Sequence, residues 1–121
     1  MPVGHRGREK KSNKLLFIHY LFAFKVVTPI CRLLANLCAG PCHGETVCLF
    51  VLRHPDVTAL LMALLGTNYT HLCKETLWLF ANIVNSESVL VQEEIVELNL
   101  MDKLEFHTTS VVQKIDPYAI K

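Results

Sequence analysis

The sequence predicts an all-α fold arranged as an α-α superhelix of about two repeats, and three observations support this prediction. Apolar residues recur at helical spacing in most segments, and no segment has the pattern of a sheet strand. Residues 32–37 and 78–83 match one another, so that Asn36 and Asn82 lie 46 positions apart. A proline break and a glycine turn divide the helices between them. Repeat periods of roughly 40–47 residues, with two or three helices each, are typical of α-helical solenoids.

The N-terminal elements follow from composition and from start and stop residues. Residues 1–14 form a basic tail that we expect to be disordered, and residues 15–27 form an apolar helix or leader. The next helix has Pro29 in its first turn, a position that suits proline, and runs to about Ala39. A Gly-Pro pair directly after Ala39 predicts the end of this helix.

Two shorter helices are expected in the middle of the chain. Gly44 can cap a helix over residues 45–53, and a His-Pro-Asp break then ends that helix. Asp56 can cap the following helix over residues 57–65. A Gly-Thr-Asn turn comes next and predicts another change of chain direction.

The C-terminal half contains the longest predicted helix. It covers residues 70–84 and is followed by a polar turn and a helix over residues 89–98. Another helix begins at residues 101–106. Residues 107–121 show no clear pattern, so we expect an irregular C-terminal tail there.

Polar and aromatic side chains form a ridge along the 70–84 helix. Steps of three and four residues place them on one face of the helix: His71, Glu75, Trp78, Asn82 and Asn85. An indole packs on aliphatic stems, and a carboxamide bonds a peptide backbone as donor and as acceptor. The ridge therefore suits an extended peptide. The structural alternative is that the tryptophan and the first asparagine pack against a neighbouring repeat.

The same stretch resembles a known family. Residues 74–83, with the sequence KETLWLFANI, resemble the third helix of an armadillo repeat of the importin-α type. Residues 56–65 and Gly66 resemble the second helix of that repeat and the tight turn after it. The resemblance covers residues 28–105, and within the family it is closest to armadillo-like proteins named for transmembrane and coiled-coil domains.

The resemblance implies an armadillo-like solenoid over residues 28–106, with a concave groove lined by its third helices. In importin-α such helices hold a nuclear-localisation signal, with tryptophan on the lysine stems and asparagine on the backbone. Trp78 and Asn82 match these two roles. Asn36 matches in the earlier repeat, whereas Arg32 stands where a tryptophan would and is expected to repel a basic ligand.

The function that these features predict is non-catalytic protein binding. The chain would be an importin-α-like adaptor for protein import into the nucleus, found in the cytoplasm and nucleus. Its partner would be a protein or peptide, such as a basic localisation signal, with no nucleic acid and no small-molecule substrate. A net charge of +1 gives no overall field for nucleic acid. The expected peptide-binding residues are Trp78, Asn82, Asn36, Arg32, Glu75 and Asn85.

No catalytic, metal-binding or cofactor-binding residue is predicted, and we do not expect an enzyme. Cys38, Cys42, His43 and Cys48 offer zinc-type ligands, but their spacing is irregular and two of them fit apolar helix faces. Neither a phosphate-binding loop nor a paired-carboxylate pattern occurs. The five cysteines are an odd count without framework spacing, as expected for a reduced, intracellular protein.

The alternative function is that of a membrane-associated structural or scaffold protein. Residues 15–24 are apolar, lie between Lys14 and Lys25, and have the shape of a signal peptide or anchor. As it stands, this stretch is too short to span a bilayer. The chain is 51% hydrophobic with 19% charged residues, so we expect a piece of a larger stack or a surface that needs a partner. A truncated product without a stable fold of its own is the remaining alternative.

Overall fold

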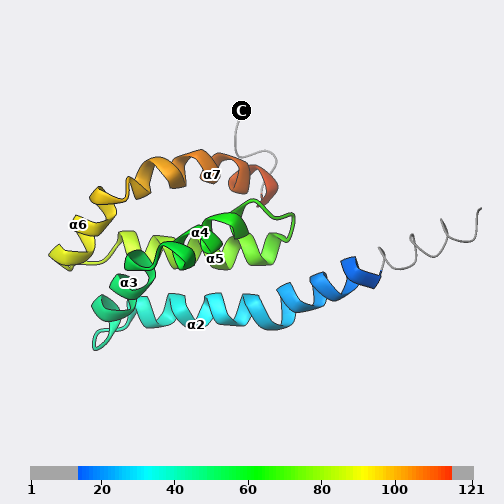
Figure 1. The fold of residues 1–121 in the computed structure, drawn as a ribbon, viewed down its shortest axis with the longest axis horizontal. Helices are drawn as coiled ribbons and strands as arrows, with labels where there is room; N and C mark the ends of the chain where they lie inside the picture. The colour runs from blue at the N-terminus through cyan, green and yellow to red at the C-terminus, as the bar shows by residue number, and fades with distance from the viewer. Residues whose placement is uncertain (1–13, 116–121) are drawn as a thin grey trace, which may run out of the picture.

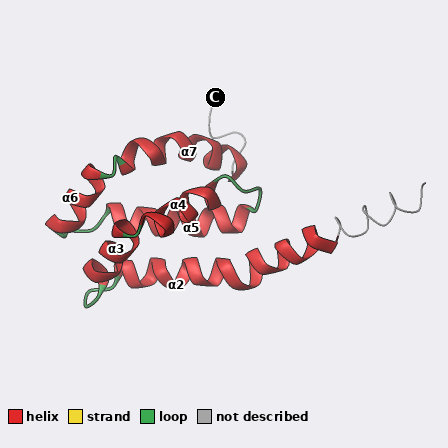
Figure 2. Cartoon of the chain, in the orientation of Figure 1, coloured by secondary structure: helices red, strands yellow, loops and turns green. Residues whose placement is uncertain are grey.

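The structure, a computed structural model, describes residues 14–115 and the side chains of residues 14–107. Within that range the chain is helical with short connections and no strand, which confirms the all-α prediction (Figure 1, Figure 2). The elements after the first helical segment, residues 14–22, are η1 (Ala23–Val27), α2 (Thr28–Ala39), α3 (Gly44–Arg53), α4 (Pro55–Leu65), α5 (Thr70–Val84), α6 (Val89–Glu97) and α7 (Leu100–Ile115). The basic tail expected over residues 1–14 lies outside the described residues except for Lys14, which is helical.

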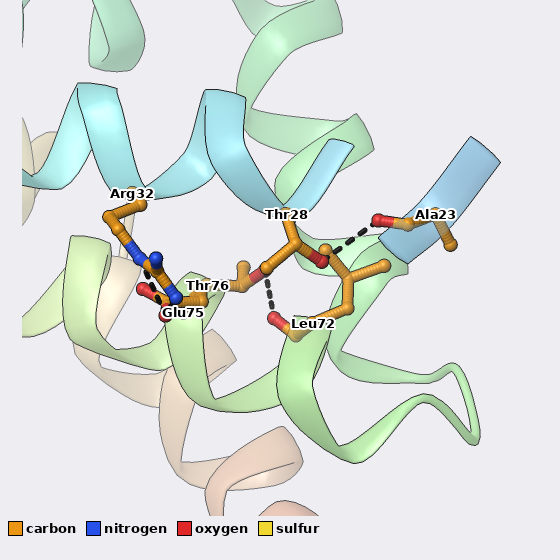
Figure 3. Close-up of polar contacts among 6 residues, drawn as sticks. All are labelled: Ala23, Thr28, Arg32, Leu72, Glu75 and Thr76. Carbon is orange, nitrogen blue, oxygen red and sulfur yellow. Dashed lines mark hydrogen bonds and ion pairs between the residues drawn. The ribbon is translucent and has the colours of Figure 1, made fainter. Parts of the chain in front are cut away.

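Helix α2 has Pro29 in its first turn and ends at Ala39, as predicted. It is not a separate helix, however, because the first helix is continuous from Lys14 to Ala39. Proline has no N–H, and its ring clashes with the carbonyl four residues earlier in a regular helix. The chain widens into the π-helical turn η1 just before this position. The Thr28 N–H bonds the Ala23 carbonyl, and the Thr28 hydroxyl donates to the same oxygen at 2.8 Å (Figure 3).

Helices α2 and α5 lie side by side and run in the same direction (Figure 1). The Thr76 hydroxyl donates to the Cys31 sulfur at 3.8 Å, and further along Asn82 Nδ2 donates to the Ala35 carbonyl at 2.8 Å. The two segments that match in sequence are therefore neighbours in space. Small side chains on α2, among them Cys31 and Ala35, let the helices approach closely because helix separation depends on the residues at the contact.

Helix α3 turns back directly against the end of α2. A Cβ atom on Gly44 would lie 2.6 Å from the Cys38 carbonyl oxygen, so this position requires glycine. The predicted capping role of Gly44 is wrong, because His43 occupies the N-cap and Gly44 is already helical. The close approach explains the glycine instead.

A sharp corner joins α3 and α4, whose axes differ by 88°. Pro55 begins α4 and Asp56 lies within its first turn, so the N-cap is His54 and not Asp56 as predicted. The Thr58 hydroxyl donates to the Val51 carbonyl at 2.7 Å and ties the two helices together across the corner.

The C-terminal helices close over α5. Helix α6 begins after Ser88, whose hydroxyl caps it by accepting the Val91 N–H at 3.3 Å. Asn99, with φ 54°, makes the turn into α7, which packs against α4, α5 and α6. Helix α7 continues to Ile115, so the irregular tail predicted from residue 107 is wrong up to that point, and residues 116–121 lie outside the described range. The largest fully buried side chains are Phe80, Leu52, Leu65, Leu72, Leu79, Ile83 and Leu100.

Candidate functional site

The six residues expected to bind a peptide lie on two neighbouring helices. Arg32 and Asn36 are one turn apart on α2. The other four follow at steps of three and four residues: Glu75, Trp78 and Asn82 lie on α5, and Asn85 is its C-cap residue. We call these six side chains the polar ridge. Because α2 and α5 pack in parallel, the polar ridge crosses two helices that are far apart in the sequence.

Arg32 and Glu75 form an ion pair at the N-terminal end of the polar ridge (Figure 3). The Arg32 Nε and Nη2 atoms both donate to Glu75 Oε1, at 3.0 and 2.6 Å. This hydrogen bonding, followed by the attraction between the charges, raises the pKa of Arg32. The pair is exposed on the arginine side, so it adds little to stability. Its consequence is local neutrality, which removes the repulsion that Arg32 alone would exert on a cationic ligand.

Asn82 has a structural role that the sequence left open as the alternative. Its half-buried side chain donates through Nδ2 to the Ala35 carbonyl at 2.8 Å and so links α5 to α2. A carboxamide has two N–H donors and an acceptor oxygen. One donor is therefore occupied within the chain, and Oδ1 remains able to accept a hydrogen bond from a ligand.

Trp78 is the aromatic residue of the polar ridge, and 60% of its surface is accessible. It is the only tryptophan in the chain. Within residues 14–107 no hydrogen bond, ion pair or ring contact engages its side chain, and the same holds for Asn36 and Asn85. An exposed indole presents a flat apolar face that packs on methylene groups and attracts cations.

His71, which the sequence places at the start of the ridge, is engaged elsewhere. Its ring meets the Phe24 ring edge to face, with centroids 5.7 Å apart, and Tyr20 meets Tyr69 at 5.8 Å. These aromatic contacts hold the first helical segment against the start of α5. A pocket of about 310 Å³ remains between the two elements.

A second pocket of about 420 Å³ lies where the C-terminal ends of α2 and α5 meet. Asn82, Asn85, Glu45 and Glu87 are among its lining residues, whereas Trp78 is not. Helix C-termini carry partial negative charge, and the two carboxylates add to it. The starts of α3 and α6 border the same pocket with the opposite partial charge, so the carboxylates decide its net sign. The pocket is therefore suited to a cationic group, and we call it the acidic pocket.

Glu45 also belongs to this site, although the sequence pattern did not predict it. Its carboxylate accepts the Ser88 hydroxyl at 2.6 Å, so it is held across the pocket by a residue 43 positions later. The only signal in the sequence is positional, since Glu45 and Glu87 each follow the end of one of the two matched helices. That relation gains meaning only when the helices are known to be neighbours.

The cysteine cluster does not assemble a metal site in the part of the chain that the structure describes. Cys38 and Cys48 are buried, whereas Cys42 and His43 are exposed. No group of three or more His, Cys, Asp or Glu side chains converges among the described residues. The contact with the Cys48 thiol, together with burial, raises the pKa of Cys38, and burial likewise raises the pKa of Cys31. Neutral thiols of this kind behave as small core residues.

The first helix has the length and composition of a membrane span. It is 26 residues long from Lys14 to Ala39, and its most apolar window is only 28% buried. Helices α3 and α4 together also have the length and composition of a membrane span, if the corner between them is counted as a break within one span. Core helices of soluble proteins and signal sequences share these properties, so length and composition alone do not assign the helix to a membrane.

Comparison with known proteins gives no relative from which a function can be carried over. No family model, no curated protein and no solved structure matches this chain. A function must therefore be inferred from the polar ridge, the acidic pocket and the apolar faces of the helices.

Proposed function

We propose that the chain is a non-catalytic protein-binding module, an armadillo-like helical stack that binds an extended basic peptide across α2 and α5. In this proposal it acts as an importin-α-like adaptor for nuclear import. The observation that carries the proposal is the 60% exposure of Trp78 on a face it shares with Asn82 and Asn85. A tryptophan that served only the core would be expected to lie under neighbouring side chains.

The binding mode follows from helix geometry. From Trp78 to Asn85 the α5 axis advances about 10 Å, at roughly 1.5 Å per residue. An extended peptide covers that length with about three residues. Its aliphatic stem would pack on Trp78, and its backbone would bond Asn85 and Asn36. A terminal ammonium would enter the pocket that Glu45 and Glu87 line.

The polar ridge also limits this function. Two helices contact only a few peptide residues, so the affinity of this chain for an isolated signal is expected to be low. Asn82 contributes mainly through Oδ1, because its amide already bonds Ala35. The Arg32–Glu75 pair contributes neutrality and not an additional cation site.

The test is a titration of the protein with a labelled lysine-rich peptide, followed by fluorescence anisotropy. We expect saturable binding that the Trp78→Ala substitution weakens about tenfold, the loss of one cation–π and stem contact. Leu60→Ala on α4 is the matched control, because Leu60 is 61% exposed and lies away from the polar ridge. It should leave the affinity unchanged.

A second readout uses the single tryptophan. Peptide binding should shift the Trp78 emission to shorter wavelength and protect it from acrylamide, and a peptide with alanine for lysine should do neither. Equal affinity of the parent and of Trp78→Ala, with normal helicity in both, would remove the proposal. Absence of any lysine-dependent binding would do the same.

A membrane-associated scaffold is the second candidate function, and one observation favours it. The apolar side chains of residues 15–18 are all more than half exposed on a helix that continues to Ala39. Flotation with neutral phosphatidylcholine vesicles tests this candidate. Retention of the protein with the vesicles, and its loss in a Phe17→Ser, Ile18→Ser variant, would support the anchor. A parent protein that stays in the soluble fraction would eliminate it.

A further inference from the structure

The contact between α2 and α5 has two sides, and each side recurs 46 positions away in the sequence on a face that stays at least partly open among the described residues. On α2 the side that faces α5 consists of the small buried residues Cys31, Ala35 and Cys38. The positions 46 residues later on α5 are Leu77, Ala81 and Val84. These three line an open apolar hollow of about 440 Å³ between α5 and α7.

The other side of the contact recurs on α2. On α5 the stripe that includes Thr76, which contacts Cys31, is fully buried and comprises Leu72, Thr76, Leu79 and Ile83. The positions 46 residues earlier on α2 and η1 form an apolar stripe at the same spacing: Val26, Ile30, Leu33 and Leu37. All four are exposed. Among the described residues this helix contact is made once, and its two complementary halves lie at opposite ends of the stack. The α2 stripe is exposed, and the α5 hollow is partly open, with Leu77 and Val84 half-buried.

We propose that a second copy of this chain docks head to tail, with the α5 hollow of one copy packed on the α2 stripe of the next. In this interface α2 of the second copy lies beside α5 of the first in the parallel arrangement that α2 and α5 already adopt within one chain. A second copy fits this place because the two open faces are the two halves of an interface that already exists between α2 and α5. The α2 stripe contains no charged side chain, and the α5 hollow has one, Glu105, among its lining residues.

The unpartnered asparagine of α2 supports the same pairing. Asn36 corresponds to Asn82, and Ala81 corresponds to Ala35. Within one chain the Asn82 amide donates to the Ala35 carbonyl at 2.8 Å. In the head-to-tail pair the Asn36 amide of one copy reaches the Ala81 carbonyl of the other by the same geometry. This interface does not depend on peptide binding.

The contact is heterologous, so each copy keeps one free half and growth is open-ended. This property gives a test with two single variants. Leu33→Asp disables the α2 stripe and Ala81→Asp disables the α5 hollow. Both residues are exposed, so both variants should fold. Sedimentation velocity should show each variant as a monomer alone. An equimolar mixture should give a mass twice that of the monomer and no larger species, because one intact half of each kind remains.

The parent should show a mass that rises with concentration, and Leu60→Asp on the exposed face of α4 should behave like the parent. Helicity of every variant is checked by circular dichroism, and Leu33→Gln with Ala81→Gln replaces any variant that loses it. Dimers of Ala81→Asp alone would show that α2 stripes pair with one another and would overturn the proposal. A monomeric parent at all concentrations, or a mixture that stays monomeric, would overturn it as well. So would a parent that associates only with vesicles, because a bilayer would then cover the stripe.

Discussion

Helices α2 and α5 share a sequence pattern but differ in what covers them. Leu79 and Ile83 on α5 are fully buried, whereas the matching Leu33 and Leu37 on α2 are 57% and 38% exposed. Helix α5 has α2 on one side and α4 and α7 on others, while this side of α2 has no neighbour among the described residues. An apolar pattern therefore tells which face of a helix is built for burial, and the neighbouring layer decides whether burial occurs.

The asparagines of the two helices show the same difference. Asn82 has an earlier helix beside it and donates to the Ala35 carbonyl, whereas Asn36 has no such helix beside it in the described part of the chain and is exposed. The same residue at the same repeat position is thus a structural link in one helix and an open donor in the other. Four substitution pairs test this comparison, in order of decreasing expected effect.

The largest difference is expected between Leu79→Ala and Leu33→Ala. Removal of a fully buried leucine leaves a cavity and should lower the free energy of unfolding by about 2–5 kcal/mol. Removal of the exposed Leu33 should change it by no more than about 0.5 kcal/mol in the monomer. Urea denaturation followed by circular dichroism measures both. Equal losses would mean that the face of α2 is covered in solution even at low concentration.

The turn after α2 gives the next largest effect. Gly44→Ala should cost about 1–3 kcal/mol, because the new methyl group would overlap the Cys38 carbonyl oxygen at 2.6 Å. Gly66→Ala is the matched control, since its Cβ would approach only the Ala63 carbonyl, at 3.4 Å, and its φ of −83° is ordinary. It should change stability by about 1 kcal/mol or less. A Gly44→Ala protein as stable as its parent would show that α3 does not approach α2 so closely.

A smaller effect is expected for the asparagine pair. Asn82→Ala removes one neutral hydrogen bond between α5 and α2 and should cost about 1 kcal/mol. Asn36→Ala should leave the stability of the monomer unchanged, because no described residue bonds its side chain. Thermal denaturation of both variants at low protein concentration makes the comparison. Identical melting temperatures would contradict the different roles that we assign to the two residues.

The smallest effect is expected for the exposed ion pair. Arg32→Gln and Glu75→Gln should each change the melting temperature only slightly, and the double variant should equal either single one. The difference from the parent should vanish in about 1 M salt, where charges are screened over roughly 3 Å. A difference that persists in high salt would indicate that the side chains stabilise α2 and α5 by packing and not by charge.

Local signals predicted much of the secondary structure. The bounds of α5, Thr70–Val84, agree with the prediction because a glycine turn and helical apolar spacing define them within a few residues. The continuous helix through Pro29 and the real role of Gly44 were not predictable, since spacing patterns reveal neither the π-helical turn before Pro29 nor how closely α3 folds back on the end of α2. The extension of α7 to Ile115 also lay beyond the pattern, because this helix packs on α4 and α5.

In the candidate site, too, features set by local spacing were predicted and features set by contacts between distant residues were not. Helical spacing alone was enough to place Glu75, Trp78 and Asn82 on one face. It could not reveal that Glu75 neutralises Arg32 or that Asn82 bonds the backbone of α2, because those contacts join residues more than 40 positions apart. The acidic pocket with Glu45 was missed for the same reason.

The π-helical turn η1 lets residues on both sides of it face the core from the same continuous helix. Buried positions on this helix fall at 23, 28, 31, 35 and 38, so a step of five precedes steps of three and four. In a regular α-helix a step of five would turn the earlier residue away from the core, because each residue advances the helix by about 100°. Deletion of one residue between Ala23 and Thr28 would therefore shorten this step to four, so that both residues would still face the core from a regular α-helix. An inserted residue would rotate residues 14–22 and carry Tyr20 away from Tyr69.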